Sequence, residues 1–333
     1  TLNDGGVATY DGFVVKLDSA GMHLWSSYLG GSGTEYGYGI AVDSGGACYA
    51  TGYTTSSGWI SGGWNTVYNG GTSDGYVVKL DGAGGHVWST YLGGTGVDYG
   101  FGIAADSSGA CYVTGTSESG GWVSGGWGTI LGGVSDGYVV KLSSAGGHMW
   151  STYLGGSDRE YSYGIAVDAS GACYAIGRTS SSGWVSGGWD TTLNGTTDGY
   201  VVKLDSAGAH MWSTYLGGSS TEYGRGIAVD ASGTCYATGD TYSSGWISGG
   251  WDTVLDSSSD GYVVKLNSAG GHEWSTYIGG TSADRGYGIA VDLSGTCYVT
   301  GYTQSSGWTS NSWGTVYNGG TSDGYVVKLD GAG

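Results

Sequence analysis

The 333-residue sequence has few cationic side chains. Ten Lys and Arg stand against 28 Asp and Glu, and the formal net charge is −18. Proteins that bind nucleic acids neutralise phosphate groups with Lys and Arg, so this charge excludes nucleic acid as a partner. The same charge opposes docking on an anionic membrane surface. No apolar run approaches the roughly 18 residues that a transmembrane helix needs, so membrane insertion is not expected.

Other features are also missing. The chain begins with Thr1 and shows no signal peptide, so we expect a processed form or a part of a longer chain. It contains neither a P-loop nor an HExxH metal-binding motif. Pro is absent and no helical periodicity is found, whereas Gly accounts for 74 residues and aromatic residues for 14% of the chain. The many aromatic residues favour a packed β protein over a disordered Gly-rich chain.

One seven-residue stretch, DGYVVKL, organises the sequence. It begins at Asp74, Asp136, Asp198, Asp260 and Asp323, and the variant DGFVVKL begins at Asp11. The spacings are 63, 62, 62, 62 and 63 residues, and the rest of the sequence keeps the same period. A fixed period of this length indicates a repeat architecture. We predict a single domain over residues 1–333, with repeats starting near residues 11, 74, 136, 198 and 260 and an extra C-terminal strand at 323–329.

Each repeat predicts four short strands. In residues 36–94 these are GYGIAVD (37–43), ACYATGYT (47–54), DGYVVKL (74–80) and HVWSTYLGG (86–94), with a long loop at 56–73. Period-two alternation between Gly- and Ser-rich turns indicates strands. Four short strands per repeat are typical of a propeller blade. The prediction is an all-β, five-bladed β-propeller of four-stranded antiparallel blades, closed into a ring by strands from both termini.

These motifs resemble the SBBP family of β-propeller repeats. The matching stretches are DGYVVKL, WSTYLGG, YGIAVDSGG and CYVTGYT with the long loop after it, in fixed order over essentially the whole chain. Two features depart from the family pattern: the loop has Trp pairs and no Pro, and Cys replaces a β-branched residue. The resemblance implies a propeller fold with the GIAVD-type strand innermost and the HVWSTYLGG-type strand outermost. It implies a secreted, extracellular or cell-surface protein, and no single activity.

The chain carries one DGYVVKL-type strand more than five blades need. Residues 12–17 and 324–329 compete for one position in the closing blade. One interpretation is that one copy is redundant. The other is that a strand is donated to a neighbouring copy, which would build filaments unless the assembly closes. The residues assigned to strand exchange or closure are Asp11, Val14, Val15 and Leu17 at one end and Asp323, Val326, Val327 and Leu329 at the other.

The long loops carry ten of the 15 Trp residues as pairs five positions apart. Loops of this length are uncommon unless they are functional or disordered, and the repeated GWxSGGW pattern argues against disorder. Three roles stay open: a cap that packs over Gly backbone, an anchor of a protein interface, or a sugar-stacking site in each blade. The pairs are Trp59 and Trp64, Trp122 and Trp127, Trp184 and Trp189, Trp246 and Trp251, and Trp308 and Trp313, the last in the divergent sequence GWTSNSW.

Other polar residues also recur once per repeat. Each repeat has one Cys at the same position. Equivalent positions lie on different repeats, too far apart for the short Cα separation of a disulfide, so the Cys residues are predicted to be buried thiols: Cys48, Cys111, Cys173, Cys235 and Cys297. The His residues are predicted to pack at turns and the strand Lys residues to pair with nearby acids. The acids that precede the first strand (Glu35, Asp98, Glu160, Glu222, Asp284) are weak candidates for Ca²⁺ ligation. No cofactor is otherwise indicated.

An active site brings different groups to one place. Here the candidate groups are repeated five times, and the charged exceptions look singly scattered (Arg159, Arg178, Arg225, Arg285, Glu118, Asp240). We therefore predict a protein that is not an enzyme. The first expectation is an extracellular structural or adhesive unit of a surface or filamentous assembly, with itself as partner. The alternative is a multivalent lectin that binds glycans through one Trp-lined site per blade.

Overall fold

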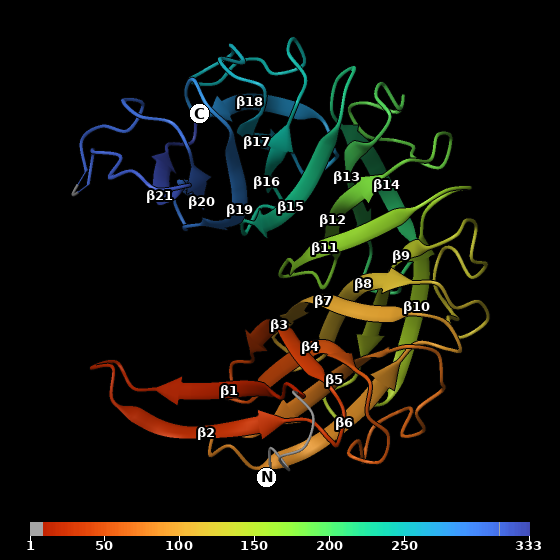
Figure 1. The fold of residues 1–333 in the computed structure, drawn as a ribbon. Coiled ribbons are helices and arrows are strands. Elements are labelled where there is room, and N and C mark those ends of the chain that lie inside the picture. Colours follow the sequence, from red (N-terminus) through yellow and green to blue (C-terminus); the bar gives the residue numbers. More distant parts are fainter. Residues whose placement is uncertain (1–8, 313) are drawn as a thin grey trace. The chain divides into compact units, whose positions relative to one another are not determined.

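The computed structural model describes residues 9–312 and 314–333, and every regular element among them is a β-strand. No helix that could cross a membrane occurs in this part of the chain. The chain divides into two compact units, residues 1–154 and residues 155–333. Their strands are labelled in Figure 1.

Four strand types recur in fixed order along both units. First strands are β3 (Glu35–Val42), β7 (Asp98–Ala105), β11 (Glu160–Val167), β15 (Glu222–Val229) and β19 (Asp284–Val291). Second strands are β4 (Cys48–Thr54), β8 (Cys111–Ser117), β12 (Cys173–Thr179), β16 (Cys235–Thr241) and β20 (Cys297–Thr303). Third strands are β1 (Gly12–Leu17), β5 (Asp74–Leu80), β9 (Asp136–Leu142), β13 (Asp198–Leu204), β17 (Asp260–Leu266) and β21 (Asp323–Leu329). Fourth strands are β2 (His23–Leu29), β6 (His86–Leu92), β10 (His148–Leu154), β14 (His210–Leu216) and β18 (His272–Ile278).

The strands form repeated antiparallel sheets. The first unit contains the hairpin β1–β2 and the four-stranded sheets β3–β4–β5–β6 and β7–β8–β9–β10. The second unit contains β11–β12–β13–β14, β15–β16–β17–β18 and the three-stranded sheet β19–β20–β21. The all-β class and the four-stranded repeat are therefore confirmed. The five-blade count and the closure of the ring stay predictions, because two of these sheets are incomplete.

The third strand matches its predicted bounds, whereas the first strand begins two residues earlier than predicted. The early residues pair before an irregularity in the register, where Gly37 faces Gly52 and Gly39 faces Thr51. Gly52 is required there, because a Cβ atom would lie 1.7 Å from the backbone oxygen of Tyr36. A bulge next to Gly is the usual way to admit one extra residue into a strand.

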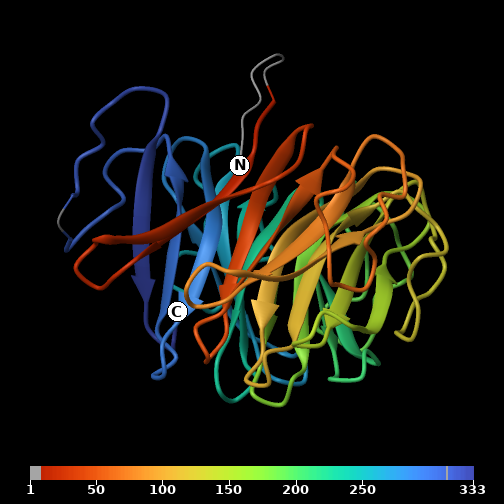
Figure 2. The same ribbon diagram turned by 90° about the horizontal axis from the view of Figure 1, so that it is seen from below.

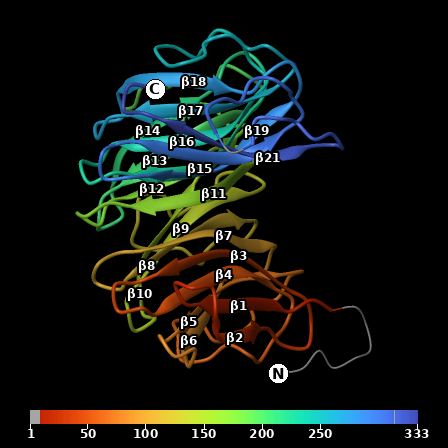
Figure 3. The same ribbon diagram turned by 90° about the vertical axis from the view of Figure 1, so that its left-hand side faces the viewer.

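Neighbouring sheets within each unit pack face to face. In the first unit, the long hairpin β1–β2 (Figures 2 and 3) buries Val14 and Leu29 against Tyr76, Val78 and Tyr91 of the next sheet. In the second unit, the core between the sheets that contain β13 and β17 is built in the same way from Tyr, Val, Leu and Trp side chains. The third strands of the four complete sheets are thus buried on both faces, as their continuous apolar sequence requires.

Within each unit, a fourth strand is also tied to the sheet that follows it. The indole Nε1 of Trp88 donates to the backbone oxygen of Ser144 at 3.0 Å, and Trp212 makes the same bond to Ser268 at 3.0 Å. The turn glycine beside each acceptor lies against the indole ring, where a Cβ at Gly146 would come 2.7 Å from Trp88. These bonds hold successive sheets in one register.

The Cys prediction is confirmed and the Lys prediction is only partly right. All five Cys are buried free thiols. Lys79 and Lys265 do lie near carboxylates, at 3.8 Å from Asp43 and 3.1 Å from Glu273. A contact with a Tyr ring recurs more often among the strand lysines than a contact with an acid. The ammonium of Lys203, for example, lies 4.8 Å from the ring centre of Tyr174 and donates to a carbonyl of the next sheet.

Candidate functional site

The first Trp of each loop is a packing residue. The indole of Trp184 is half-buried, donates to the Thr179 hydroxyl at 3.1 Å, and meets the Tyr200 ring edge-to-face at 5.1 Å. The same donation to a strand hydroxyl occurs in every loop, from Trp59 to Thr54, Trp122 to Ser117, Trp246 to Thr241 and Trp308 to Thr303. These contacts favour the capping role for the first Trp, because its polar edge is already satisfied inside the protein.

The second Trp is exposed in each described loop, and in two loops it is seen to lie on the following sheet. Trp64 stacks on the imidazole of His148 at 4.3 Å between ring centres, and Trp189 stacks on His272 at 4.2 Å. Trp127 is exposed as well. Trp251 is the most exposed of the described second Trp residues, at 55%. Trp313 lies outside the described residues.

The loop reaches the second Trp by pairing with the outer edge of the fourth strand. Ser89 donates its N–H to Ser61 at 2.7 Å, and Tyr91 donates to Asn65 at 2.8 Å. The second glycine of the loop pattern lies so close that a Cβ at Gly63 would come 2.5 Å from the Ser89 oxygen. The loop therefore needs its Gly-Gly pair in order to pack against the fourth strand.

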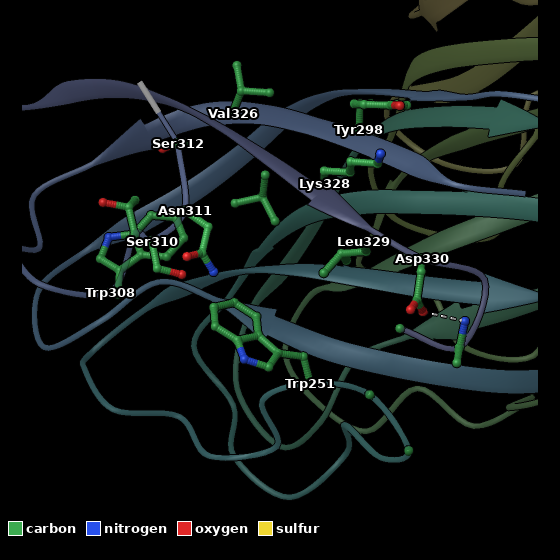
Figure 4. Close-up of a pocket in the computed structure, with 16 residues that line it drawn as sticks. Trp251, Tyr298, Trp308, Ser310, Asn311, Ser312, Val326, Lys328, Leu329 and Asp330 are labelled. Carbon is green, nitrogen blue, oxygen red and sulfur yellow. Dashed lines mark hydrogen bonds between the residues drawn. The ribbon is translucent and has the colours of Figure 1, made fainter. Parts of the chain in front are cut away.

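The last sheet lacks this fourth strand. Among the described strands β21 pairs with β20 alone. A cavity of about 940 Å³ lies along its open edge, lined by residues that include Trp251, Trp308, Asn311, Lys328 and Leu329 (Figure 4). Val326 is 71% exposed, whereas Val263 at the same position of β17 is fully buried. The edge and face of β21 are thus uncovered where the third strands of the four complete sheets are covered.

The residues predicted to take part in strand exchange or closure are partly buried and partly exposed. Asp11, directly before β1, is half-buried; within β1, Val14 is buried, and Val15 and Leu17 are exposed together with Phe13. In β21, Leu329 is buried, Val327 and Asp323 are half-buried, and Val326 is exposed. The structure therefore places both strands at incomplete sheets.

Buried carboxyl groups anchor the loops between sheets. Asp198 accepts the N–H groups of Asn194 and Gly195 at 2.9 and 3.1 Å, and Glu222 accepts that of Gly218 at 2.9 Å. Burial, together with the charge of Glu222, raises the pKa of Asp198 to about 6. Burial likewise raises the pKa of Glu222.

These carboxyl groups do not resemble a Ca²⁺ site, which needs six to eight oxygen ligands. Their oxygens face N–H and O–H donors, including the Thr241 hydroxyl at 2.9 Å from Glu222. In residues 9–312 and 314–333 no three His, Cys, Asp or Glu side chains gather as metal ligands. The acids are hydrogen-bonding anchors in this structure.

Three of the four arginines converge in the second unit. The guanidinium of Arg178 lies 4.4 Å from the ring centre of Tyr161 and 5.2 Å from that of Tyr223. The guanidinium of Arg225 lies 5.3 Å from Tyr223 and 4.8 Å from Tyr287. We call Arg178, Arg225 and Arg285, with the acid Asp240, the arginine cluster.

A buried carboxylate joins two members of the arginine cluster. Asp240 is fully buried and pairs with Arg225, and its other oxygen lies 3.7 Å from Nε of Arg285. Arg285 also donates to the Tyr242 hydroxyl at 3.2 Å. The prediction that these charges are scattered is therefore wrong. They occupy one end of the first and second strands in successive repeats, and the packing of neighbouring sheets brings those ends together.

Comparison with known proteins supports the repeat family. Residues 87–121 and 273–307 match the SBBP family model, described as a beta-propeller repeat, so the chain contains SBBP-type repeats. The "Regulatory protein FlaEY" of Caulobacter vibrioides is 26% identical over 341 residues, which covers 95% of this chain. The chain spans about a third of that relative's length, 34%.

Solved structures give weaker likenesses. The Pan2 WD40 domain of Neurospora crassa matches with a TM-score of 0.38 and 10% identity, over 80% of this chain and 75% of that one. A protein of unknown function from Bacteroides caccae matches with a TM-score of 0.33 and 9% identity, over 83% of this chain and 99% of the other.

Proposed function

We propose that this chain is a non-enzymatic, extracellular structural unit that assembles head to tail by strand exchange. A fourth strand of one copy would complete the three-stranded sheet of the next, which makes a five-bladed propeller of each unit in a filament. The observation that carries this proposal is that β1 and β21, two equivalent third strands, each have a single partner strand among the described elements. A chain that only closed its own ring would need one of them.

The strand β2 has the sequence and register that the open edge of β21 requires. In the complete sheet, Gly261 faces Ile278, Lys265 faces Trp274 and Leu266 faces His272. β2 already pairs in this register with β1, because Gly12 faces Leu29, Lys16 faces Trp25 and Leu17 faces His23. Since β1 and β21 have nearly the same sequence, exchange of one for the other would keep the cross-strand pairs.

One aromatic side chain at the cavity, Trp251, is suited to the incoming strand. Trp64 and Trp189 each stack on the His that begins a fourth strand of the following sheet, and Trp251 borders the cavity instead. His23 of an incoming β2 would supply the missing ring. The stack would cover the most exposed of the described second Trp residues and so favour assembly through burial of aromatic surface.

The divergent loop and the divergent fourth strand would meet in the completed sheet. Ser312 stands where the other loops have the tightly packed second glycine, and Ser27 stands where the other fourth strands have Thr. In complete sheets these positions touch, since a Cβ at Gly63 would lie 2.9 Å from Cβ of Thr90. The methyl group that Ser27 lacks relieves part of this crowding, and the close approach of Cβ atoms that remains means that the divergent loop would lie farther from an incoming β2 than the Gly-Gly loops lie from their own fourth strands.

We assign β1 the role of a temporary cover for β2. Tyr325 of β21 donates its hydroxyl to the backbone oxygen of Arg285 at 3.0 Å, and Tyr262 makes the equivalent bond to Tyr223 at 3.2 Å. Phe13 occupies this position in β1 and has no hydroxyl. As the third strand beside β20, β1 would therefore leave the Arg285 carbonyl without this donor, which costs free energy, so β21 is the better permanent third strand of that sheet.

Two deletions test this assembly. Light scattering and electron microscopy would be applied to the full chain, to a chain lacking residues 1–21 and to one lacking residues 1–31. The full chain should polymerise in a concentration-dependent way. Removal of β1 alone should keep or speed assembly, whereas removal of β1 and β2 should abolish it. Trp251→Ala should weaken assembly, and the matched control Trp189→Ala should not.

Monomers of the full chain at all concentrations would contradict the proposal, because β2 would then close its own ring. Assembly that disappears when only residues 1–21 are removed would identify β1 as the donated strand and would contradict its role as a cover.

A lectin is the second candidate. A hollow of about 410 Å³ lies between neighbouring loops of the first unit, with Trp64 and Asn65 on one side and Trp122 on the other. An aromatic face beside an amide fits a neutral sugar. Binding of neutral glycans that is lost in Trp64→Ala and kept in Trp59→Phe would favour this function.

A further inference from the structure

We propose that the arginine cluster binds the carboxylate of an acidic sugar, such as a uronic acid residue of an extracellular polysaccharide. This site lies on the first and second strands of the second unit and does not depend on strand exchange.

The local charge calls for an anion. The chain has 28 acids and 10 bases, yet three arginines meet a single carboxylate here, which leaves a formal charge of 3 − 1 = +2. Arg178 has no carboxylate partner within 4 Å among the described residues, although it is half-buried. An arginine that served only to balance charge in this acidic protein would be expected to pair with one of its many carboxylates when half-buried.

The single carboxylate of the cluster is shared between two arginines. Asp240 is fully buried and accepts from Nε of Arg225 through Oδ1, a bond that does not use the terminal nitrogens of that guanidinium. Its Oδ2 lies 3.7 Å from Nε of Arg285, an ion pair without a hydrogen bond in the described part of the chain. Guanidinium groups bind carboxylates through two parallel N–H bonds.

Tyrosine rings specify a sugar rather than a simple oxyanion. The guanidinium of Arg178 lies between Tyr161 and Tyr223, and that of Arg225 between Tyr223 and Tyr287. These rings restrict the arginines, and Tyr287 remains 45% exposed. A pyranose ring can pack on such an exposed ring while its carboxylate reaches the adjacent arginine.

Calorimetric titration of the full chain with a galacturonic acid trimer tests the proposal, with a neutral galactose trimer as the reference ligand. We expect the acidic trimer alone to bind. Arg178→Gln should weaken binding about tenfold or more, the loss expected for one charge-assisted contact. Arg159→Gln is the matched control, because Arg159 is the one arginine outside the cluster and is exposed.

A second variant guards against misfolding. Arg225→Gln combined with Asp240→Asn removes both partners of the closer buried pair, so that only the half-buried Arg285 loses its ion-pair partner. It should also lose binding while its thermal unfolding stays cooperative. Equal binding of the neutral trimer, unchanged binding by Arg178→Gln or an equal loss in Arg159→Gln would overturn the proposal. An equal Kd for inorganic sulfate would overturn the assignment to a sugar.

Discussion

The buried carboxyl groups predict that this protein is more stable in mildly acidic than in neutral solution. Asp198 is fully buried and lies beside Glu222. Burial raises its pKa from 3.8 to about 6, so the folded state keeps a proton that the unfolded state releases above pH 4. The contribution of Asp198 to stability is therefore largest below pH 4 and falls as the pH rises to about 6.

The expected size follows from that shift in pKa. A tenfold change in proton affinity corresponds to about 1.4 kcal/mol, so ionisation of Asp198 costs the folded state about 3 kcal/mol by pH 7. Asp198→Asn mimics the protonated acid and cannot ionise. Relative to the unchanged protein, its free energy of unfolding should therefore rise by about 3 kcal/mol between pH 4 and pH 7.

Urea unfolding followed by Trp fluorescence at pH 4, 5, 6 and 7 measures this difference. Asp205→Asn is the control, because Asp205 caps an exposed turn in the same repeat through the N–H groups of Ala207 and Ala209. A difference between Asp198→Asn and the unchanged protein that stays constant or falls with pH would refute the reasoning.

Three further outcomes follow from the packing. Trp184→Ala should lower the free energy of unfolding by about 2–3 kcal/mol, because it removes a half-buried indole and its hydrogen bond. Trp189→Ala should lower it by less than about 1 kcal/mol. Urea unfolding compares the two variants, and a larger loss for Trp189→Ala would contradict the assigned roles. Gly188→Ala places a Cβ 2.6 Å from the Ser213 oxygen and should lower Tm clearly; an unchanged Tm would show that the loop does not dock there. Burial raises the pKa values of Cys111 and Cys235 to about 12, so iodoacetamide at pH 8 should label neither until the chain unfolds, as mass spectrometry would show.

The strands could be predicted from the sequence because their signals are local. Alternation, turn glycines and the fixed period place each third strand correctly, and the turn acid behaves as predicted, since Asp43 accepts the N–H groups of Gly45 and Ala47 at 2.9 and 3.0 Å. The early start of the first strand was not predictable in this way, because it depends on a bulge that forms only when Tyr36 and Gly52 meet.

The arginine cluster could not be predicted from single residues. Arg178 and Arg225 lie 47 positions apart (225 − 178) on different strand types, and only the stacking of sheets brings both beside Tyr223. The sequence does indicate where such a site lies. The first and second strands differ between repeats at the residues that flank the bulge, whereas the third strands hardly differ. The variable residues therefore mark the end of the sheets at which the repeats carry different side chains.

The bonds between successive sheets also determine how far apart in the sequence the partners lie. Trp88 reaches Ser144 across 56 residues and Lys203 reaches Ser268 across 65, and the bonds from Trp25 and Trp274 to the next turn both span 57. Because each tie spans about one repeat, a growing polypeptide can fix each sheet as soon as the following repeat has left the ribosome. The entropic cost of closing such loops depends on their length and not on the number of repeats. Additional repeats could therefore be gained or lost during evolution without slowing the folding of those already present.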